Sequence, residues 1–278
     1  MTESEWLTSR DSQAMLAFAR GMGQRDCRCG CHVTDRKLRL FACACCRAVW
    51  HLLTDERSQH AVEVAERYAD GLATQEELIA AWKAAWDVAS AAASDVASAA
   101  AWSTASAAAW STAWWTARAA ANAVARAAAW GAQAALLRDI AGNPFRPVVV
   151  DLAWLTPTVV TLASAAYEER LTEKACPERW CAGTGMVGPS GTLDPVRLAI
   201  LADALEEAGC AEEDCTACGG HGWTGEISLV SERWARTTVC ESCKGTGRCN
   251  PLLIHLRSPG PHVRGCWAVD LVLGKEQP

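Results

Sequence analysis

The chain has 278 residues, of which 50% are hydrophobic and 21% are charged, and its formal net charge is −6. This length and apolar content allow a sizeable buried core, which excludes an intrinsically disordered protein. The acidic balance argues against a broad nucleic-acid-binding surface, because nonspecific affinity for phosphates comes from Lys and Arg.

Cysteine usage indicates the cellular compartment. The sequence contains fifteen cysteines, an odd number, and several of them have CxxC spacing. Its first ten residues, MTESEWLTSR, lack the basic and then apolar run of a secretory signal. We therefore expect a cytoplasmic protein, in which metal ligation by cysteines is favoured over a disulfide framework.

The N-terminal region predicts a helix followed by a cysteine-rich loop. Thr2 and Glu5 have the spacing of a capping box, and residues 11–20 predict a short helix that ends at the glycines of 21–23. The next segment, DCRCGCH, lies in a glycine-containing turn. It offers four candidate metal ligands: Cys27, Cys29, Cys31 and His32.

Residues 34–53 are apolar on nearly all sides after a charged first turn, which predicts a buried helix. Three cysteines within it, Cys43, Cys45 and Cys46, are interpreted as small core side chains, because adjacent cysteines on a helix point in different directions. A second helix is predicted over 55–70, capped by Thr54 and ended by Gly71.

From a predicted capping box at Thr74 and Glu77, the chain enters an Ala/Trp-rich low-complexity tract over 79–135. An eight-residue repeat, such as WDVASAAA and WSTASAAA, predicts either one long helix or a helical hairpin, and places Trp82 and Trp86 on one side. Residues 96–117 carry no charge, but they consist largely of Ala, Ser and Thr. We expect no membrane span there, because Leu, Ile and Phe are the residues that favour insertion.

The C-terminal half predicts further helices joined by irregular segments. Helices are expected from Pro157, from Pro195 to about Gly209, and in two short apolar stretches after Asn250. Between them, residues 174–193 form a Gly/Pro-rich excursion that contains Cys176 and Cys181.

The most specific motif is a pair of CxxCxGxG repeats, CTACGGHG and CESCKGTG, within residues 215–247. Two thiolates three residues apart can hold one metal ion from a tight turn, and the following glycines let the chain curl back. Two such turns supply the four sulfurs that structural zinc prefers. We predict that Cys215, Cys218, Cys240 and Cys243 bind one Zn²⁺, with sulfurs within about 4 Å of one another.

A second zinc site is a further prediction. The two other cysteine-bearing loops, 22–33 and 174–193, are expected to meet in space, because neither completes a site alone. Its candidate ligands are Cys27, Cys29, Cys31, His32, Cys176 and Cys181.

The CxxCxGxG pair resembles the cysteine-rich zinc region of DnaJ-type chaperones over about 33 residues. Two repeats are present here where that family usually has four, and nothing resembles its J-domain. The resemblance implies a zinc site and contact with other proteins.

Most of the remaining chain resembles a helical family abundant in planctomycete genomes, on motifs that include GNPFRPV at 142–148 and SPGPHVRGCW at 258–267. This resemblance implies a helical fold and no particular activity. Compared with the sequence pattern of that family, this chain contains three additional segments: 22–33, 174–193 and 211–248.

Together these features predict an all-α fold, in which 1–278 is a single helical bundle domain and 211–248 is an inserted, β-hairpin-like zinc segment. The chain lacks phosphate-loop, dinucleotide-binding, HExxH and GxSxG motifs, so we predict a protein that is not an enzyme. The predicted function is zinc binding in a module or scaffold that contacts another protein. A single-stranded nucleic-acid-binding zinc protein and a thiol-based redox enzyme are the alternatives.

Overall fold

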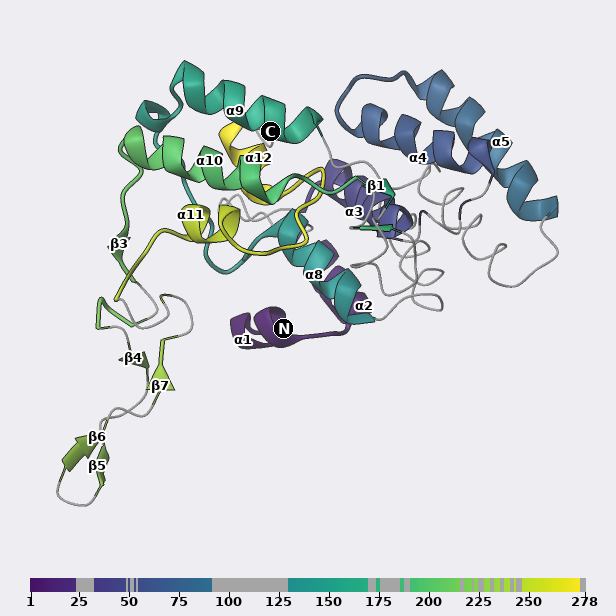
Figure 1. The fold of residues 1–278 in the computed structure, drawn as a ribbon. Coiled ribbons are helices and arrows are strands. Elements are labelled where there is room, and N and C mark those ends of the chain that lie inside the picture. The colour runs from purple at the N-terminus through teal and green to yellow at the C-terminus, as the bar shows by residue number, and fades with distance from the viewer. Residues whose placement is uncertain are drawn as a thin grey trace. The chain divides into compact units, whose positions relative to one another are not determined.

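A computed structural model shows a mostly helical chain (Figure 1), which confirms the predicted fold class at that level. The structure describes residues 1–23, 33–48, 50, 53, 55–91, 130–169, 174–175, 186–187, 191–215, 218–221, 223–224, 228–230, 233–235, 238–240, 243 and 247–275. The contacts divide the chain into two compact units, one of 1–147, 166–194 and 260–278 and the other of 148–165 and 195–259. The single-domain organisation remains a prediction.

The first unit is built mainly from helices. They are α1 (Glu3–Thr8), α2 (Ser12–Gly23), α3 (Asp35–Ala48), α4 (Glu56–Ala69), α5 (Gln75–Ala91), α8 (Trp130–Ala141) and α12 (Trp267–Val272). Strands β1 (Lys174–Ala175) and β2 (Met186–Val187) pair antiparallel in the same unit.

Capping residues define several helix starts. Thr2 and Glu5 form the predicted capping box, in which each side chain accepts the other residue's backbone N–H. Thr74 and Glu77 do the same at the start of α5. Each box provides acceptors for N–H groups that would otherwise lack a partner at a helix start.

Helix α2 ends at Gly23, within the glycine-containing segment where the sequence predicted its end. One local prediction was wrong. The N-cap of α4 is Asp55 rather than Thr54, since the Asp55 carboxylate accepts the N–H of Arg57. Asp and Thr are both good N-caps, and the sequence alone did not decide which residue is last before the helix.

The core of this unit has two clusters that share α3. One face of α3 packs with α1, α2 and α8 around Trp6, Phe41 and Leu137. The other packs with α4 and α5 around Val62 and Leu78. The three cysteines of α3, Cys43, Cys45 and Cys46, are at most 1% exposed, which confirms their interpretation as core side chains.

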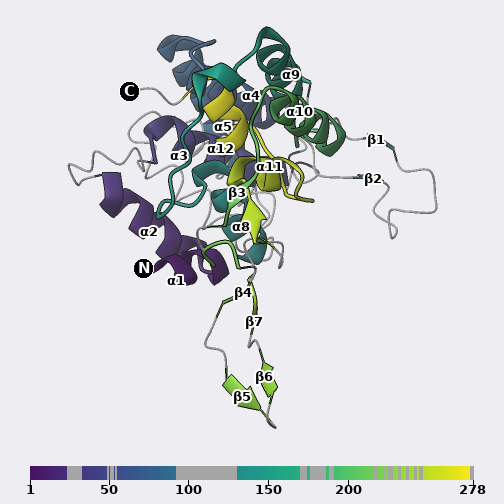
Figure 2. The ribbon, with the colours of Figure 1, turned by 90° about the vertical axis from the view of Figure 1, so that its left-hand side faces the viewer.

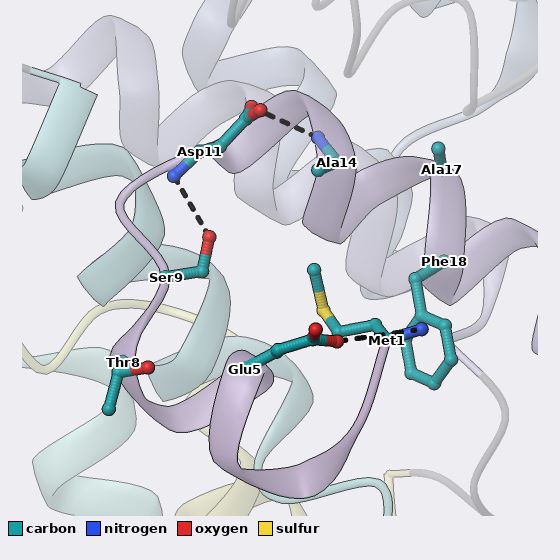
Figure 3. Close-up of a pocket in the computed structure, with 8 residues that line it drawn as sticks. All are labelled: Met1, Glu5, Thr8, Ser9, Asp11, Ala14, Ala17 and Phe18. Carbon is teal, nitrogen blue, oxygen red and sulfur yellow. Dashed lines mark hydrogen bonds and ion pairs between the residues drawn. The ribbon is translucent and has the colours of Figure 1, made fainter.

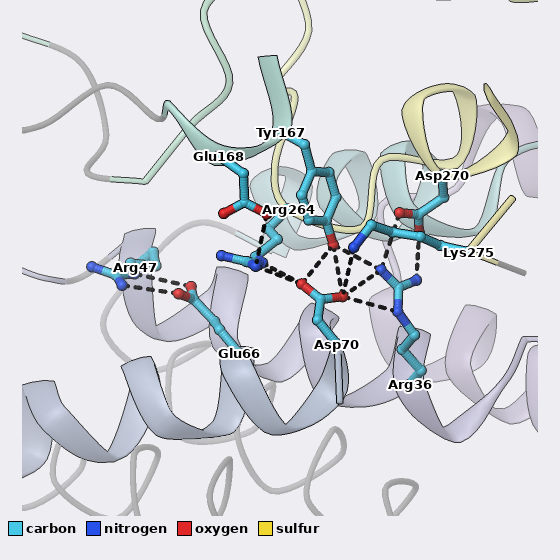
Figure 4. A network of polar contacts seen from close by, with 9 residues as sticks. All are labelled: Arg36, Arg47, Glu66, Asp70, Tyr167, Glu168, Arg264, Asp270 and Lys275. Atoms are coloured by element: carbon cyan, nitrogen blue, oxygen red, sulfur yellow. Dashed lines mark hydrogen bonds and ion pairs between the residues drawn. The ribbon is translucent and has the colours of Figure 1, made fainter. Parts of the chain in front are cut away.

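A buried polar network lies within this unit (Figure 4). The carboxylate of Asp70, at the end of α4, is fully buried and pairs with Arg36 at 2.8 Å and with Arg264 at 2.6 Å. It also accepts a hydrogen bond from the Tyr167 hydroxyl at 3.0 Å. Arg36 forms a further ion pair with Asp270, at 2.6 Å. A buried charged side chain is tolerated when an oppositely charged group pairs with it, and the ion pairs of this network provide such partners.

The second unit consists of short helices and a β-ribbon. Its helices are α10 (Pro195–Glu207), α11 (Pro251–Leu256), the 3₁₀ turn η2 (Leu152–Trp154) and the part of α9 (Pro157–Glu168) up to residue 165. Its strands are β3 (Glu213–Asp214), β4 (Trp223–Thr224), β5 (Ser228–Val230), β6 (Arg233–Ala235), β7 (Thr238–Val239) and β8 (Arg248–Cys249).

The strand pairing is nested: β3 pairs with β8, β4 with β7 and β5 with β6, all antiparallel. The chain therefore leaves α10, runs out along one side of a two-stranded ribbon and returns along the other to α11, as Figure 2 shows. At the base, Glu213 lies opposite Cys249. The segment 211–248 thus begins and ends at neighbouring points of the backbone.

The Ala/Trp tract lies mostly outside the described residues, and so does the uncharged stretch 96–117. At its beginning, the Trp82 and Trp86 rings lie 5.7 Å apart between centroids, in agreement with their predicted placement on one side. Among the described helices, none combines the length and the apolarity that a membrane crossing requires.

Candidate metal centre

The four predicted zinc ligands lie between two ladders of the ribbon. Cys215 directly follows β3, and Cys240 directly follows β7, so β-pairing holds the two CxxC turns side by side. All four cysteines are buried, with exposed fractions between 1% and 9%. Burial of four thiols in a ribbon with little apolar core of its own is typical of a metal-stabilised segment.

Backbone hydrogen bonds shape the first CxxC turn. The N–H groups of Cys218 and Gly220 both donate to the carbonyl oxygen of Cys215, at 3.2 and 3.1 Å. Gly219 and Gly220 have φ angles of 60° and 81°, which a residue without Cβ adopts at no steric cost. The glycines of the motif therefore serve the tight curl that the spacing predicted.

The second turn is closed in a related way. The N–H of Gly247 donates to the sulfur of Cys243 at 3.3 Å, and its carbonyl accepts the N–H of Cys215 at 2.7 Å. Gly247 thus connects the second turn to the first. An N–H aimed at a sulfur stabilises the thiolate that a metal requires.

The sulfur positions fit a tetrahedral ion. The Sγ atoms of Cys215 and Cys240 are 3.8 Å apart, and those of Cys218 and Cys243 are 3.7 Å apart. All four lie within 4.8 Å of one another. Zn–S bonds of ~2.3 Å at tetrahedral angles place sulfurs about 3.8 Å apart. The cluster can hold a metal ion, and the Cys215–Cys240 and Cys218–Cys243 pairs meet the predicted 4 Å spacing.

Disulfide bonds do not account for this arrangement. A disulfide joins its sulfurs at about 2.05 Å, whereas the sulfurs of Cys215 and Cys240, and those of Cys218 and Cys243, are separated by nearly twice that distance. None of the four cysteines forms a disulfide bond. Four reduced thiols converging in one buried position point to cation binding rather than to a covalent crosslink.

A fifth cysteine contacts the cluster, and the sequence analysis did not assign it. Cys249 of β8 is half-buried and packs against the four predicted ligands. Burial raises the pKa of its thiol above the ordinary value. The signal was weak in the sequence, since Cys249 lies outside both CxxCxGxG repeats.

The structure does not test the predicted second zinc site. Cys27, Cys29, Cys31, His32, Cys176 and Cys181 all lie outside the described residues. The site therefore remains a prediction.

Another group of possible ligands was not predicted from the sequence. Ligand atoms of Asp139, His262 and Cys266 lie within 4.8 Å of one another, and all three residues are buried. The Asp139 carboxylate forms a hydrogen bond with His262 Nδ1 at 2.8 Å and accepts another from the backbone N–H of Val263 at 2.9 Å. Burial, followed by the charge of Asp139, raises the pKa of Cys266 well above its usual range. A carboxylate with these donors is a satisfied buried group, and the trio is a structural hydrogen-bond cluster.

A pocket of about 740 Å³ lies beside α1 and α2 (Figure 3). Its two carboxylates are engaged with helix starts: Glu5 accepts the N–H of Thr2, and Asp11 accepts the N–H groups of Gln13 and Ala14. The polar groups of this pocket thus have structural roles, and its geometry points to no reaction.

Comparison with protein-family models, curated proteins and solved structures finds no match. The resemblances to DnaJ-type zinc regions and to the planctomycete family therefore remain predictions from sequence motifs.

Proposed function

We propose that this chain is a zinc-binding protein that is not an enzyme, in which one structural Zn²⁺ stabilises the inserted segment 211–248 for contact with another protein. The observation that carries the proposal is the convergence of Cys215, Cys218, Cys240 and Cys243, with sulfur separations of 3.8 and 3.7 Å. Four soft thiolates in a tetrahedron select zinc over magnesium or calcium. Four protein ligands would also leave no coordination position for a water nucleophile.

The surroundings of the cluster support a structural role for the ion. The ladders around it have strands of two or three residues, and two-stranded ribbons are marginal in water without further support. A metal whose binding free energy is released only in the folded state would stabilise such a ribbon. Beyond the ion, the ribbon could then present a defined surface.

Contact with a partner is supported by an exposed apolar residue in the described part of the ribbon. Val239 of β7 is 47% exposed and directly precedes the ligand Cys240. Apolar residues near a rigid metal-bound turn are suited to contact with protein rather than with phosphates, which would require Lys and Arg.

Elemental analysis of the purified full chain tests the metal. We expect zinc, with C240S/C243S containing one ion per chain fewer than the unaltered protein. The second predicted site is separated by the same assay, because C176S/C181S would remove a different ion. Equal zinc contents in the unaltered protein and in C240S/C243S would refute the proposed zinc centre. Iron bound in place of zinc would refute the proposed identity of the metal.

Photo-crosslinking tests the partner role. A photoreactive amino acid at Val239 should yield a crosslinked product that disappears in C240S/C243S. The same group at Leu152, which is 78% exposed in the same unit, serves as the control. A product that is independent of the metal, or equal product from both positions, would argue against contact through the ribbon.

A further inference from the structure

Helix α10 carries apolar side chains on two opposite sides. Leu198, Leu201 and Leu205 are fully buried inside the second unit. On the other side, Val196 is 66% exposed and Ile200 is 46% exposed, and their spacing of four residues makes them neighbours on the helix surface. The outer side of a surface helix is ordinarily polar. These two residues instead form an apolar strip that faces solvent.

The strip continues into carboxylates toward the C-terminal end of α10. Asp203 and Glu207 follow Ile200 at helical spacing, and both are exposed. Glu207 lies in the last turn, which is the negative end of the helix dipole, so a carboxylate there lowers the stability of the helix. Helix stability therefore does not account for the presence of Glu207.

Helix α11 adds a second element to the same surface. It packs against α10 (Figure 1), and Arg257 at its C-terminal end pairs with Asp203 at 2.6 Å and with Glu206 at 2.7 Å. Ile254 is 42% exposed and precedes Arg257 by three residues, so both side chains leave α11 on one side. The following residues are called the α10–α11 face: Val196, Ile200, Asp203, Glu207, Ile254 and Arg257.

The surroundings of this face are acidic. The sequence contains six Asp and Glu residues over 203–214 and no Lys or Arg over 198–232. Arg257 is shared by two carboxylates, so this group of three side chains keeps a net negative charge. Glu212 and Asp214, which follow α10, are also exposed. They extend the negative charge to the base of the ribbon.

An apolar strip beside carboxylates limits the chemistry of a partner. Nucleic acids and anionic lipid surfaces require Lys and Arg, and this face offers the opposite charge. A basic amphipathic helix is complementary to it, because apolar residues four positions apart cover the strip while Lys and Arg pair with the carboxylates. The distance along α10 from Val196 to Glu207 is about 16 Å at ~1.5 Å per residue, which matches about three turns of such a helix.

We propose that the α10–α11 face docks a basic amphipathic helix of another protein. The apolar side of that helix covers the exposed Val and Ile residues of the face, and its Lys and Arg residues lie against Asp203 and Glu207. Since the segment 211–248 leaves from α10 and returns to α11, the docked helix lies close to the base of the ribbon. The inference concerns the two helices and does not depend on the zinc centre.

A synthetic peptide tests the chemistry of this surface. The probe is a fluorescein-labelled amphipathic peptide of Leu and Lys, about four turns long, and its control is the analogue with Glu in place of every Lys. Fluorescence anisotropy with the full chain measures binding. We expect saturable binding of the Lys peptide, weakened at least about threefold when the salt concentration rises from about 50 to about 300 mM. The Glu peptide should not bind.

Variants of the face locate the binding. V196S/I200S removes the apolar strip and E207K reverses one charge; because these side chains are exposed, the helical circular dichroism signal should be unchanged. We expect V196S/I200S to weaken binding of the Lys peptide by about tenfold or more and E207K by about threefold or more. The matched controls should bind within about twofold of the unaltered protein: L152S removes another exposed apolar side chain of the same unit, and E63K makes the same charge change on α4.

The results that would overturn the proposal are specific. Equal binding of the Lys peptide by V196S/I200S and by the unaltered protein, equal binding of the Lys and Glu peptides, or no binding at millimolar peptide would each do so. Sedimentation velocity examines the remaining occupant. If the unaltered chain self-associates and V196S/I200S does not, a second copy covers the face and the proposed partner is wrong.

Discussion

The buried network around Asp70 makes a quantitative prediction for the substitution Asp70→Asn. The Asp70 carboxylate is 0% exposed and is shared by the guanidinium groups of Arg36 and Arg264. An amide of the same shape keeps one acceptor oxygen but carries no charge. Arg36 retains its contact with Asp270, whereas Arg264 loses its buried counter-charge.

The expected cost follows from these contacts. A hydrogen bond to a charged group contributes about 1.5–3 kcal/mol, and removing one partner of a buried ion pair costs about 3–5 kcal/mol. We expect Asp70→Asn to lower the free energy of unfolding by about 3 kcal/mol, a large share of the ~5–15 kcal/mol that domains possess. Urea denaturation followed by circular dichroism at 222 nm measures this loss.

Asp55→Asn is the matched control, because Asp55 lies at the opposite end of the same helix. Its pair with Arg57 is solvent-exposed, at 33% and 56%, so it contributes at most about 1 kcal/mol. Asn is as good an N-cap as Asp, so the helix start is retained. If Asp70→Asn costs less than about 1 kcal/mol, or no more than Asp55→Asn, the reasoning about the buried network is refuted.

The pH dependence of the same variant gives an independent check. Burial raises the pKa of Asp70, but Arg264 and Arg36 together outweigh this effect, so the pKa lies below its ordinary value of 3.8. A carboxyl group with a lowered folded-state pKa stabilises the protein above its unfolded-state pKa, and this contribution is lost as the pH falls through the folded-state pKa. The difference in unfolding free energy between the unaltered protein and Asp70→Asn should therefore be constant near neutral pH and shrink below about pH 3.8.

Two further predictions concern the backbone and the ribbon. Gly265 has a φ of 89°, and an added Cβ would lie 2.7 Å from the Leu40 side chain. Gly265→Ala should therefore cost about 1–3 kcal/mol more than Gly71→Ala, which has a similar φ but nothing within 4 Å of the added Cβ; equal thermal midpoints would contradict this. Deletion of 211–248 should leave the helical circular dichroism signal and cooperative melting largely intact, because β3 and β8 bring its ends together. Loss of cooperative folding in that variant would show that the segment belongs to the core.

Much of the local structure could be predicted from the sequence. The capping boxes at Thr2 and Thr74 and the buried cysteines of α3 were recognised correctly. These features depend on residues three or four positions apart, whose side chains meet wherever a helix forms. Each CxxC turn was also recognised, because its spacing brings two sulfurs together before any tertiary contact is made. That the two turns meet was predicted from the four ligands that zinc prefers, and strand pairing is what holds them together.

Only the tertiary structure decided the remaining features. Arg36 and Asp270 are 234 residues apart, and nothing near either residue indicates the other. The sequence analysis assigned no role to Cys249, although strand pairing places it against the four-cysteine cluster. Helix propensity and motif spacing describe a chain over a few neighbouring residues, whereas a buried charge or a fifth thiol gains its partner only when distant segments pack. The fold class and the two CxxC turns are therefore properties of the local sequence, while the meeting of those turns, the buried charge network and the contact of Cys249 with the cluster are properties of the folded chain.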